Sequence, residues 1–152
     1  MSNKLWILGV IGFVMIAGSA QLSNYMYADR VIIKAVLDGN HTEASRLIDE
    51  GVDIYIRATN GTTALMAAAS RGDTKLVKLL LDHGADVNSA CDRGATALID
   101  AVYKEHKDIV LLLLAANADP NIKDKNNATA LNLAKMQNNQ ELAEILVAHG
   151  AR

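Results

Sequence analysis

The stretch TALMAAA at residues 63–69 returns 33 residues later as TALIDAV at 96–102, and after a further 33 residues as TALNLAK at 129–135. The similarity extends through whole units, because residues 61–93 align without a gap with 94–126 and then with 127–152. A more divergent copy lies at about 28–60. Such a period indicates a repeat architecture in which each unit is one small supersecondary motif.

Each unit predicts two short helices followed by a turn. In the second copy Leu65 and Ala68 follow helical spacing, Gly72 interrupts the pattern, and a leucine-rich segment then resumes it. Gly84 is predicted to end the second helix with φ above zero, and Asn117 takes the same place in the next copy. The polar residues that follow are expected to form a turn.

These units resemble ankyrin repeats, in which a Thr-Pro-Leu-His opening and a first helix precede a Val/Leu-rich helix and a Gly-Ala-Asp-Val-Asn turn. The best copy matches at Gly61, Thr63, Leu65, Ala68, Ala69, Gly72, Leu79, Leu80, Gly84, Ala85, Asp86 and Asn88. The resemblance implies an all-α repeat solenoid of about four ankyrin repeats, each a helix-turn-helix with a β-turn finger. The expected repeats lie at about 28–60, 61–93, 94–126 and 127–152.

The units depart from the family pattern at the opening of the first helix. Alanine replaces the family's Pro at Ala64, Ala97 and Ala130, and other residues replace its His at Met66, Ile99 and Asn132. The Thr–His bond that braces the family's turn is therefore not expected here. Each Thr can still cap the helix that it opens, because its hydroxyl accepts a hydrogen bond from an unpaired N–H of the first turn.

Composition limits the classes of function. With 152 residues and 51% hydrophobic content, the chain can bury a core. Its 15 basic and 17 acidic residues give a net charge of −2 without any block of like charge, which disfavours nucleic-acid binding. A single repeat cannot bury its own apolar faces, so stability is expected from stacking of neighbouring repeats, with polar end units.

The first 20 residues are interpreted as a signal peptide. Lys4 precedes the apolar run LWILGVIGFVMIA at 5–17, and the small residues of 18–20 suit cleavage after Ala20. We expect a linker at 21–27, a repeat domain at 28–152 and a periplasmic or secreted bacterial protein. The alternative is an uncleaved inner-membrane anchor at 5–23, although thirteen strongly apolar residues would span only ~20 Å of a ~30 Å hydrocarbon core.

A catalytic or metal site finds little support in the sequence. His83 and His149 share one register position, whereas His41 and His106 fall near the turn between helices, and no ligand spacing accompanies any of them. Cys91 is expected at an exposed finger tip, which leaves a redox role open. We therefore predict no enzyme activity, no metal and no cofactor.

Protein binding is the predicted function, because extended concave faces are what solenoids offer. Positions that differ between copies are predicted to be free of packing and available to a protein partner. Nucleic acid is not an expected partner. They are Arg57, Thr59, Asn60, Ser70, Arg71, Asp92, Arg93, Tyr103, Lys104, Lys123, Lys125 and Asn126. Met136 and Gln137 vary in the same way.

Tyr103 and Arg93 are the predicted anchors, since these residue types are enriched among interface hot spots. Lys123 and Lys125 make one end basic, which favours an acidic patch on the partner. Two narrower roles remain open at this point. One is an inhibitor or immunity-type protein for an exported enzyme or toxin, and the other is a membrane-tethered scaffold.

Overall fold

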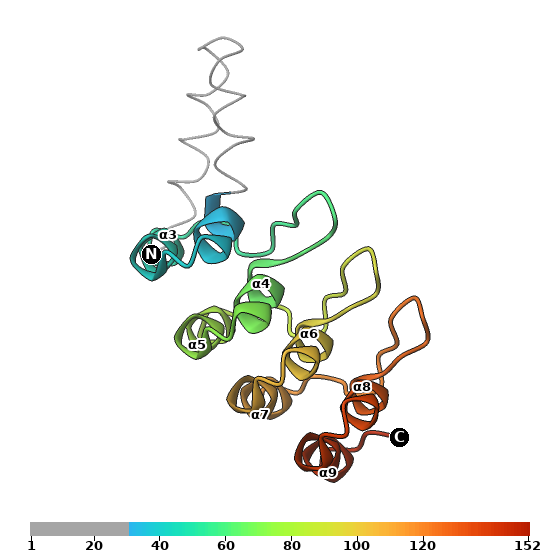
Figure 1. Cartoon of the computed structure of the whole chain (residues 1–152). Coiled ribbons are helices and arrows are strands. Elements are labelled where there is room, and N and C mark those ends of the chain that lie inside the picture. Colours follow the sequence, from blue (N-terminus) through green and yellow to red (C-terminus); the bar gives the residue numbers. More distant parts are fainter. Residues whose placement is uncertain (1–30) are drawn as a thin grey trace, which may run out of the picture.

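A computed structural model describes residues 31–152, which form a stack of helix pairs (Figure 1). Residues 31–37 are helical and precede α3 (His41–Asp49). The pairs that follow are α4 (Ala64–Arg71) with α5 (Thr74–Asp82), α6 (Ala97–Tyr103) with α7 (Lys107–Ala115), and α8 (Ala130–Met136) with α9 (Gln140–Ala148). The predicted leader at 1–20, the alternative anchor at 5–23 and the linker at 21–27 lie outside the described residues.

The helices form two layers with loops projecting from one side. In Figure 1, α4, α6 and α8 lie in a row, α3, α5, α7 and α9 make a second row, and three long loops extend on the far side of the first row. We call these loops the fingers and define them as residues 56–62, 89–95 and 122–128. The prediction of an all-α repeat solenoid is confirmed. No helix between residues 31 and 152 combines the length and apolar character needed to span a bilayer.

Threonine opens each first helix, as predicted. Thr63, Thr96 and Thr129 are buried N-cap residues, and each hydroxyl accepts a hydrogen bond of 3.3 Å from the backbone N–H three residues later. In the last repeat Asn132 completes a capping box, because its side-chain oxygen accepts the Thr129 N–H at 2.9 Å. The equivalent residues of the second and third repeats, Met66 and Ile99, have no side-chain oxygen and cannot make this second bond.

Residues with positive φ fall at the same places in successive repeats. Gly84 and Asn117, predicted to end their helices in this conformation, have φ of 83° and 63°. At the finger turns the neighbour also matters, because a Cβ at Gly61 would lie 2.9 Å from the Asp92 nitrogen of the next finger. The equivalent residue of the last finger, Asn127, is exposed and keeps a φ of 61°. Glycine is therefore needed wherever another finger packs closely.

A polar ladder joins the turns that follow the second helices. The side-chain oxygen of Asn88 accepts the N–H of Asp119 at 2.8 Å, and that of Asn121 accepts the N–H of Arg152 at 3.0 Å, so each bond crosses to the next repeat. At the equivalent position of the first repeat Tyr55 donates its hydroxyl to the carbonyl of Gly84 at 3.2 Å. Neighbouring repeats are thus held in register at this edge as well as by their core.

The core runs through the stack, but in the fourth repeat some of the positions that are apolar and buried in earlier repeats are occupied by polar residues. Val36, Ala69 and Val102 occupy one register position and are at most 1% exposed. In the fourth repeat the same position is Lys135, which is exposed. The buried Ile99 of the third repeat is likewise replaced by the exposed Asn132 at the equivalent position of the fourth repeat. The outer surface of the fourth repeat therefore suits solvent rather than a further apolar contact.

This register gives a matched pair of stability predictions. Val102→Lys would bury an unpaired ammonium group between repeats and is expected to lower the free energy of unfolding by more than ~3 kcal/mol. Lys135→Val, the reverse change one repeat later, is expected to stay within ~0.5 kcal/mol of the parent. Urea denaturation followed by circular dichroism measures both values. Equal losses in the two variants would contradict the assignment of position 135 to an outer surface.

Candidate interaction surface

The fingers are fixed to one another through their backbones. The N–H of Asp92 donates to the carbonyl of Asn60 at 3.0 Å, and the N–H of Lys125 donates to the carbonyl of Arg93 at 2.9 Å. Both bonds join a finger tip to the tip of the preceding finger. The side chains at the tips therefore project from a row of loops whose spacing is set by main-chain hydrogen bonds.

A row of carbonyls at the ends of the first helices is bonded across each repeat junction. These acceptors, the carbonyls of Leu37, Ser70 and Tyr103, occupy the same register position. Their partners come from the following repeat and are Arg71, the Nε2 atom of His106 at 3.3 Å and the side-chain amide of Gln137 at 2.8 Å. Carbonyls at a helix end have no hydrogen-bond donor within the helix. Here different side chains of the following repeat bond to them at equivalent positions.

Two of the predicted binding residues have packing roles of this kind. Arg71 donates to the carbonyl of Leu37, and Arg57 donates to the carbonyl of Ala90 in the next finger. The prediction that variable positions are free of packing is wrong for these two arginines. The reason is that a long guanidinium side chain can span one repeat junction, so a residue can vary in type and still join neighbours.

The other predicted residues are distributed over the fingers and the ends of the first helices. Ser70 is half-buried. The exposed members are Thr59, Asn60, Asp92, Arg93, Tyr103, Lys104, Lys123, Lys125 and Asn126. Tyr103 is 60% exposed, with the Lys104 ammonium 5.5 Å from its ring centre, and Met136 at the same register is 76% exposed. Large apolar side chains therefore stand in solvent beside basic ones.

Sequence reasoning missed Asp100, which lies on α6 behind this surface. It is half-buried, and the equivalent residues of the second and fourth repeats are Ala67 and Leu133. Burial raises the pKa of the Asp100 carboxyl, and the positive charges of Arg93 and Lys104 oppose that rise. The signal was available in the repeat alignment, because Asp100 is an acid at a position where the neighbouring second and fourth copies have apolar residues and the first copy has Lys34.

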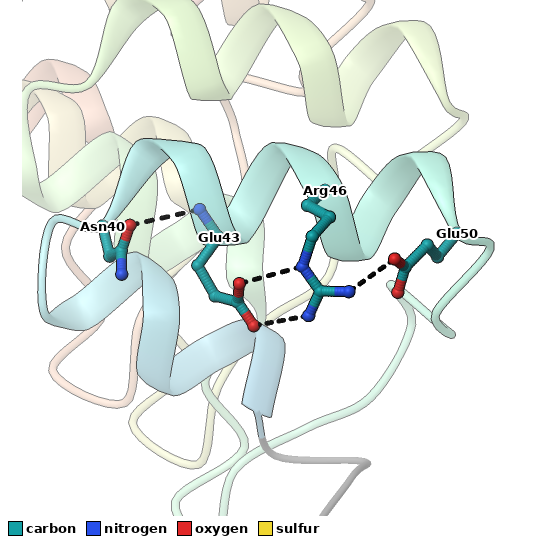
Figure 2. Close-up of polar contacts among 4 residues, drawn as sticks. All are labelled: Asn40, Glu43, Arg46 and Glu50. Carbon is teal, nitrogen blue, oxygen red and sulfur yellow. Dashed lines mark hydrogen bonds and ion pairs between the residues drawn. The ribbon is translucent and has the colours of Figure 1, made fainter.

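Some charges of the helix row opposite the fingers are paired with one another. Figure 2 shows Arg46 of α3 between Glu43 and Glu50, with a distance of 2.7 Å from its Nη2 to a Glu43 carboxylate oxygen. Hydrogen bonds to the two carboxylates raise the pKa of Arg46, and the bond to Arg46 lowers the pKa of Glu43. Lys107 of α7 likewise pairs with Glu141 of α9. Such exposed pairs add little to stability, but they cancel charge at this surface.

The cysteine and histidines hold structural positions. Cys91 is only 8% exposed, so the expectation of an exposed thiol is wrong, because the residue lies inside its finger turn with its carbonyl bonded to the Gly94 N–H at 2.7 Å. His83 and His149 are exposed C-cap residues of α5 and α9. In the described part of the chain, no group of three or more His, Cys, Asp or Glu residues could hold a metal ion.

Comparison with protein families identifies the repeats. A family model of ankyrin repeats, in three copies, matches residues 32–124. No curated protein sequence matches the chain as a relative. The matched range covers more than half of the chain and includes the helices from α3 to α7. The helix pair α8 and α9 beyond it continues the same stack.

The raised pKa of Asp100 predicts a pH-dependent effect of replacing it. Because the folded pKa lies above the unfolded one, the favourable contribution of the protonated acid is lost as pH rises through the folded value. Asp100→Asn is therefore expected to raise the unfolding midpoint at about pH 7, and the gain should largely vanish near pH 3. Thermal unfolding at both pH values tests this, with the exposed Asp92→Asn as control. A lower midpoint at neutral pH would instead show that Arg93 and Lys104 stabilise the ionised acid.

Proposed function

The chain belongs to the ankyrin-repeat family, and from this we propose that it is a noncatalytic module that holds a protein partner against its fingers and first-helix ends. Ankyrin repeats are in general protein–protein interaction modules. The observation that supports the proposal for this chain is the set of large side chains left in solvent there. Tyr103 and Met136 are both more than half exposed, and the Lys104 ammonium lies 5.5 Å from the ring centre of Tyr103.

The surface is also well preorganised for binding. The carbonyl of Tyr103 accepts from Gln137 and that of Arg93 accepts from the Lys125 N–H, so the backbones of both predicted anchors are fixed by the next repeat. A partner would not have to order these segments, which lowers the entropic cost of association. The side chains themselves remain exposed and can contact the partner directly.

We further propose that the module works outside the cytoplasm. The support is the N-terminal pattern, in which Lys4, the apolar run at 5–17 and the small residues at 18–20 have the order of an export signal. A membrane-tethered scaffold is the second candidate, favoured by the absence of charged residues between Lys4 and Asp29. The two differ in whether the first 20 residues stay attached.

Removal of the two anchors tests the binding proposal. Tyr103→Ala together with Arg93→Ala should leave thermal unfolding almost unchanged, since the backbone bonds at both positions remain. Partner affinity should fall at least ~10-fold, because hot-spot residues each contribute more than ~1 kcal/mol. Pull-down followed by titration calorimetry with the recovered partner measures the loss.

The matched control is Leu111→Ala, which removes an exposed apolar side chain from α7, in the row opposite the fingers. It should leave binding unchanged. Equal recovery of the partner by the parent and by the Tyr103/Arg93 variant would refute binding at this surface. A loss of binding in the Leu111 variant alone would indicate that the partner binds the helix row opposite the fingers.

The leader is tested on the chain made in its native host. Intact mass and N-terminal sequencing should show a mature chain that begins at Gln21, in the extracytoplasmic fraction. That chain would lack Trp6, the single tryptophan, so its intrinsic tryptophan fluorescence should be absent. A membrane fraction in which the chain begins at Met1 would instead support the tethered scaffold.

A further inference from the structure

Charge is divided between the two sides of the stack. The fingers hold four basic residues, Arg57, Arg93, Lys123 and Lys125, and two acidic ones, Asp92 and Asp124. The helices of the opposite row, α3, α5, α7 and α9, hold four basic and six acidic residues. The turns that follow the first three of these helices add Glu50, Asp53, Asp86 and Asp119. A chain of net negative charge thus carries a net positive charge on its fingers.

The cations near the third finger form no ion pairs in the described part of the chain. Arg93, Lys104, Lys123 and Lys125 are exposed, and none forms an ion pair or a side-chain hydrogen bond within residues 31–152. Asp124, the acid among them, is used inside its own finger, where its carboxylate accepts the N–H groups of Asn126 at 2.8 Å and Ala128 at 2.9 Å. In the opposite row Arg46 and Lys107 pair with acids, whereas Lys75 and Lys78 form no ion pair within residues 31–152.

These four cations and the two exposed apolar residues lie at finger tips and first-helix ends of adjoining repeats, and Arg93 and Lys104 both act on the charge of Asp100. Lys125 is joined to Arg93 through the backbone, Lys104 lies over the ring of Tyr103, and Gln137 ties Tyr103 to the repeat of Met136. We define the cationic patch as Arg93, Tyr103, Lys104, Lys123, Lys125 and Met136. It extends from the end of the second repeat across the third repeat to the fourth.

We propose that the cationic patch docks an acidic segment of the protein partner, one whose Asp or Glu side chains alternate with apolar residues. This inference rests on the proposed function and specifies the chemistry of the partner. Carboxylates of the segment would pair with Arg93 and the three lysines. The guanidinium of Arg93 can bind a carboxylate in a bidentate manner. Apolar side chains of the segment would cover Tyr103 and Met136, which gives the contact an anchor besides charge.

A protein segment fits the patch better than a nucleic acid does. Phosphate backbones are bound by rows of cations that neutralise many charges in succession. Here the half-buried Asp100 and the exposed Asp92 stand beside Arg93 and Lys104. These acids would repel a continuous phosphate chain, whereas an acidic peptide can place its carboxylates and its N–H groups separately.

The test compares two charge reversals of equal size in the full chain. Lys123→Glu with Lys125→Glu reverses two charges in the patch, and Lys75→Glu with Lys78→Glu reverses two exposed, unpaired lysines of α5 in the opposite row. The probe is a fluorescein-labelled synthetic peptide of alternating Glu and Leu with one central Tyr. A matched peptide with Lys for Glu and a single-stranded oligothymidylate serve as controls. Fluorescence anisotropy at low and physiological salt measures the affinities.

The acidic peptide should bind the parent, and the finger double variant should bind it roughly tenfold more weakly, whereas the α5 variant should stay within about twofold. Failure of the acidic peptide to bind, or equal losses in both variants, would overturn the inference. Tighter binding of the oligothymidylate would overturn it in favour of nucleic acid. Capture of a native partner through Tyr103 and Arg93, with no effect of the finger double variant, is a further outcome. That result would overturn the acidic-segment inference and leave the proposed function intact.

Discussion

Burial of apolar surface between adjacent repeats is the interaction on which the rest of this structure depends. A pair of helices such as α6 and α7 is too short and too apolar on two sides to be stable in water alone. Packed between its neighbours, it buries Leu98, Val102 and Leu113 almost completely. Each repeat therefore contributes to the core of the next one, and the spacing of the stack follows from the size of these side chains.

The polar contacts between repeats are organised by that stacking. Once the first helices are aligned, equivalent carbonyls at their ends face the following repeat at regular intervals, and each finds a donor. Finger tips and turns are joined in the same manner by backbone and asparagine bonds. A net contribution of about 1 kcal/mol is typical for such a bond, so the main effect of the ladders is to fix register.

Rigid register has a consequence for recognition. Side chains on different loops can act as one surface only if the loops keep a constant spacing, and here main-chain bonds between Asn60 and Asp92 and between Arg93 and Lys125 set that spacing. Charge is then sorted by element. In the opposite helix row Arg46 and Lys107 form ion pairs, while Arg93, Lys123 and Lys125 of the fingers form none within residues 31–152. Stability and binding thus use different sides of the same stack.

The sequence by itself determined the repeat length, the helix openings and the left-handed turns, because these depend on local chemistry. Threonine caps its own helix, and Gly84 or Asn117 adopts a conformation costly for most residues, whatever lies beyond. Tertiary structure alone decided which side chains are free. Arg57 and Arg71 vary between copies as Arg93 does, yet they bond across repeat junctions. Cys91 is covered within its finger, and Asp100 is partly removed from water. The two arginine bonds join residues 33 and 34 positions apart, a proximity that stacking creates and local sequence does not encode.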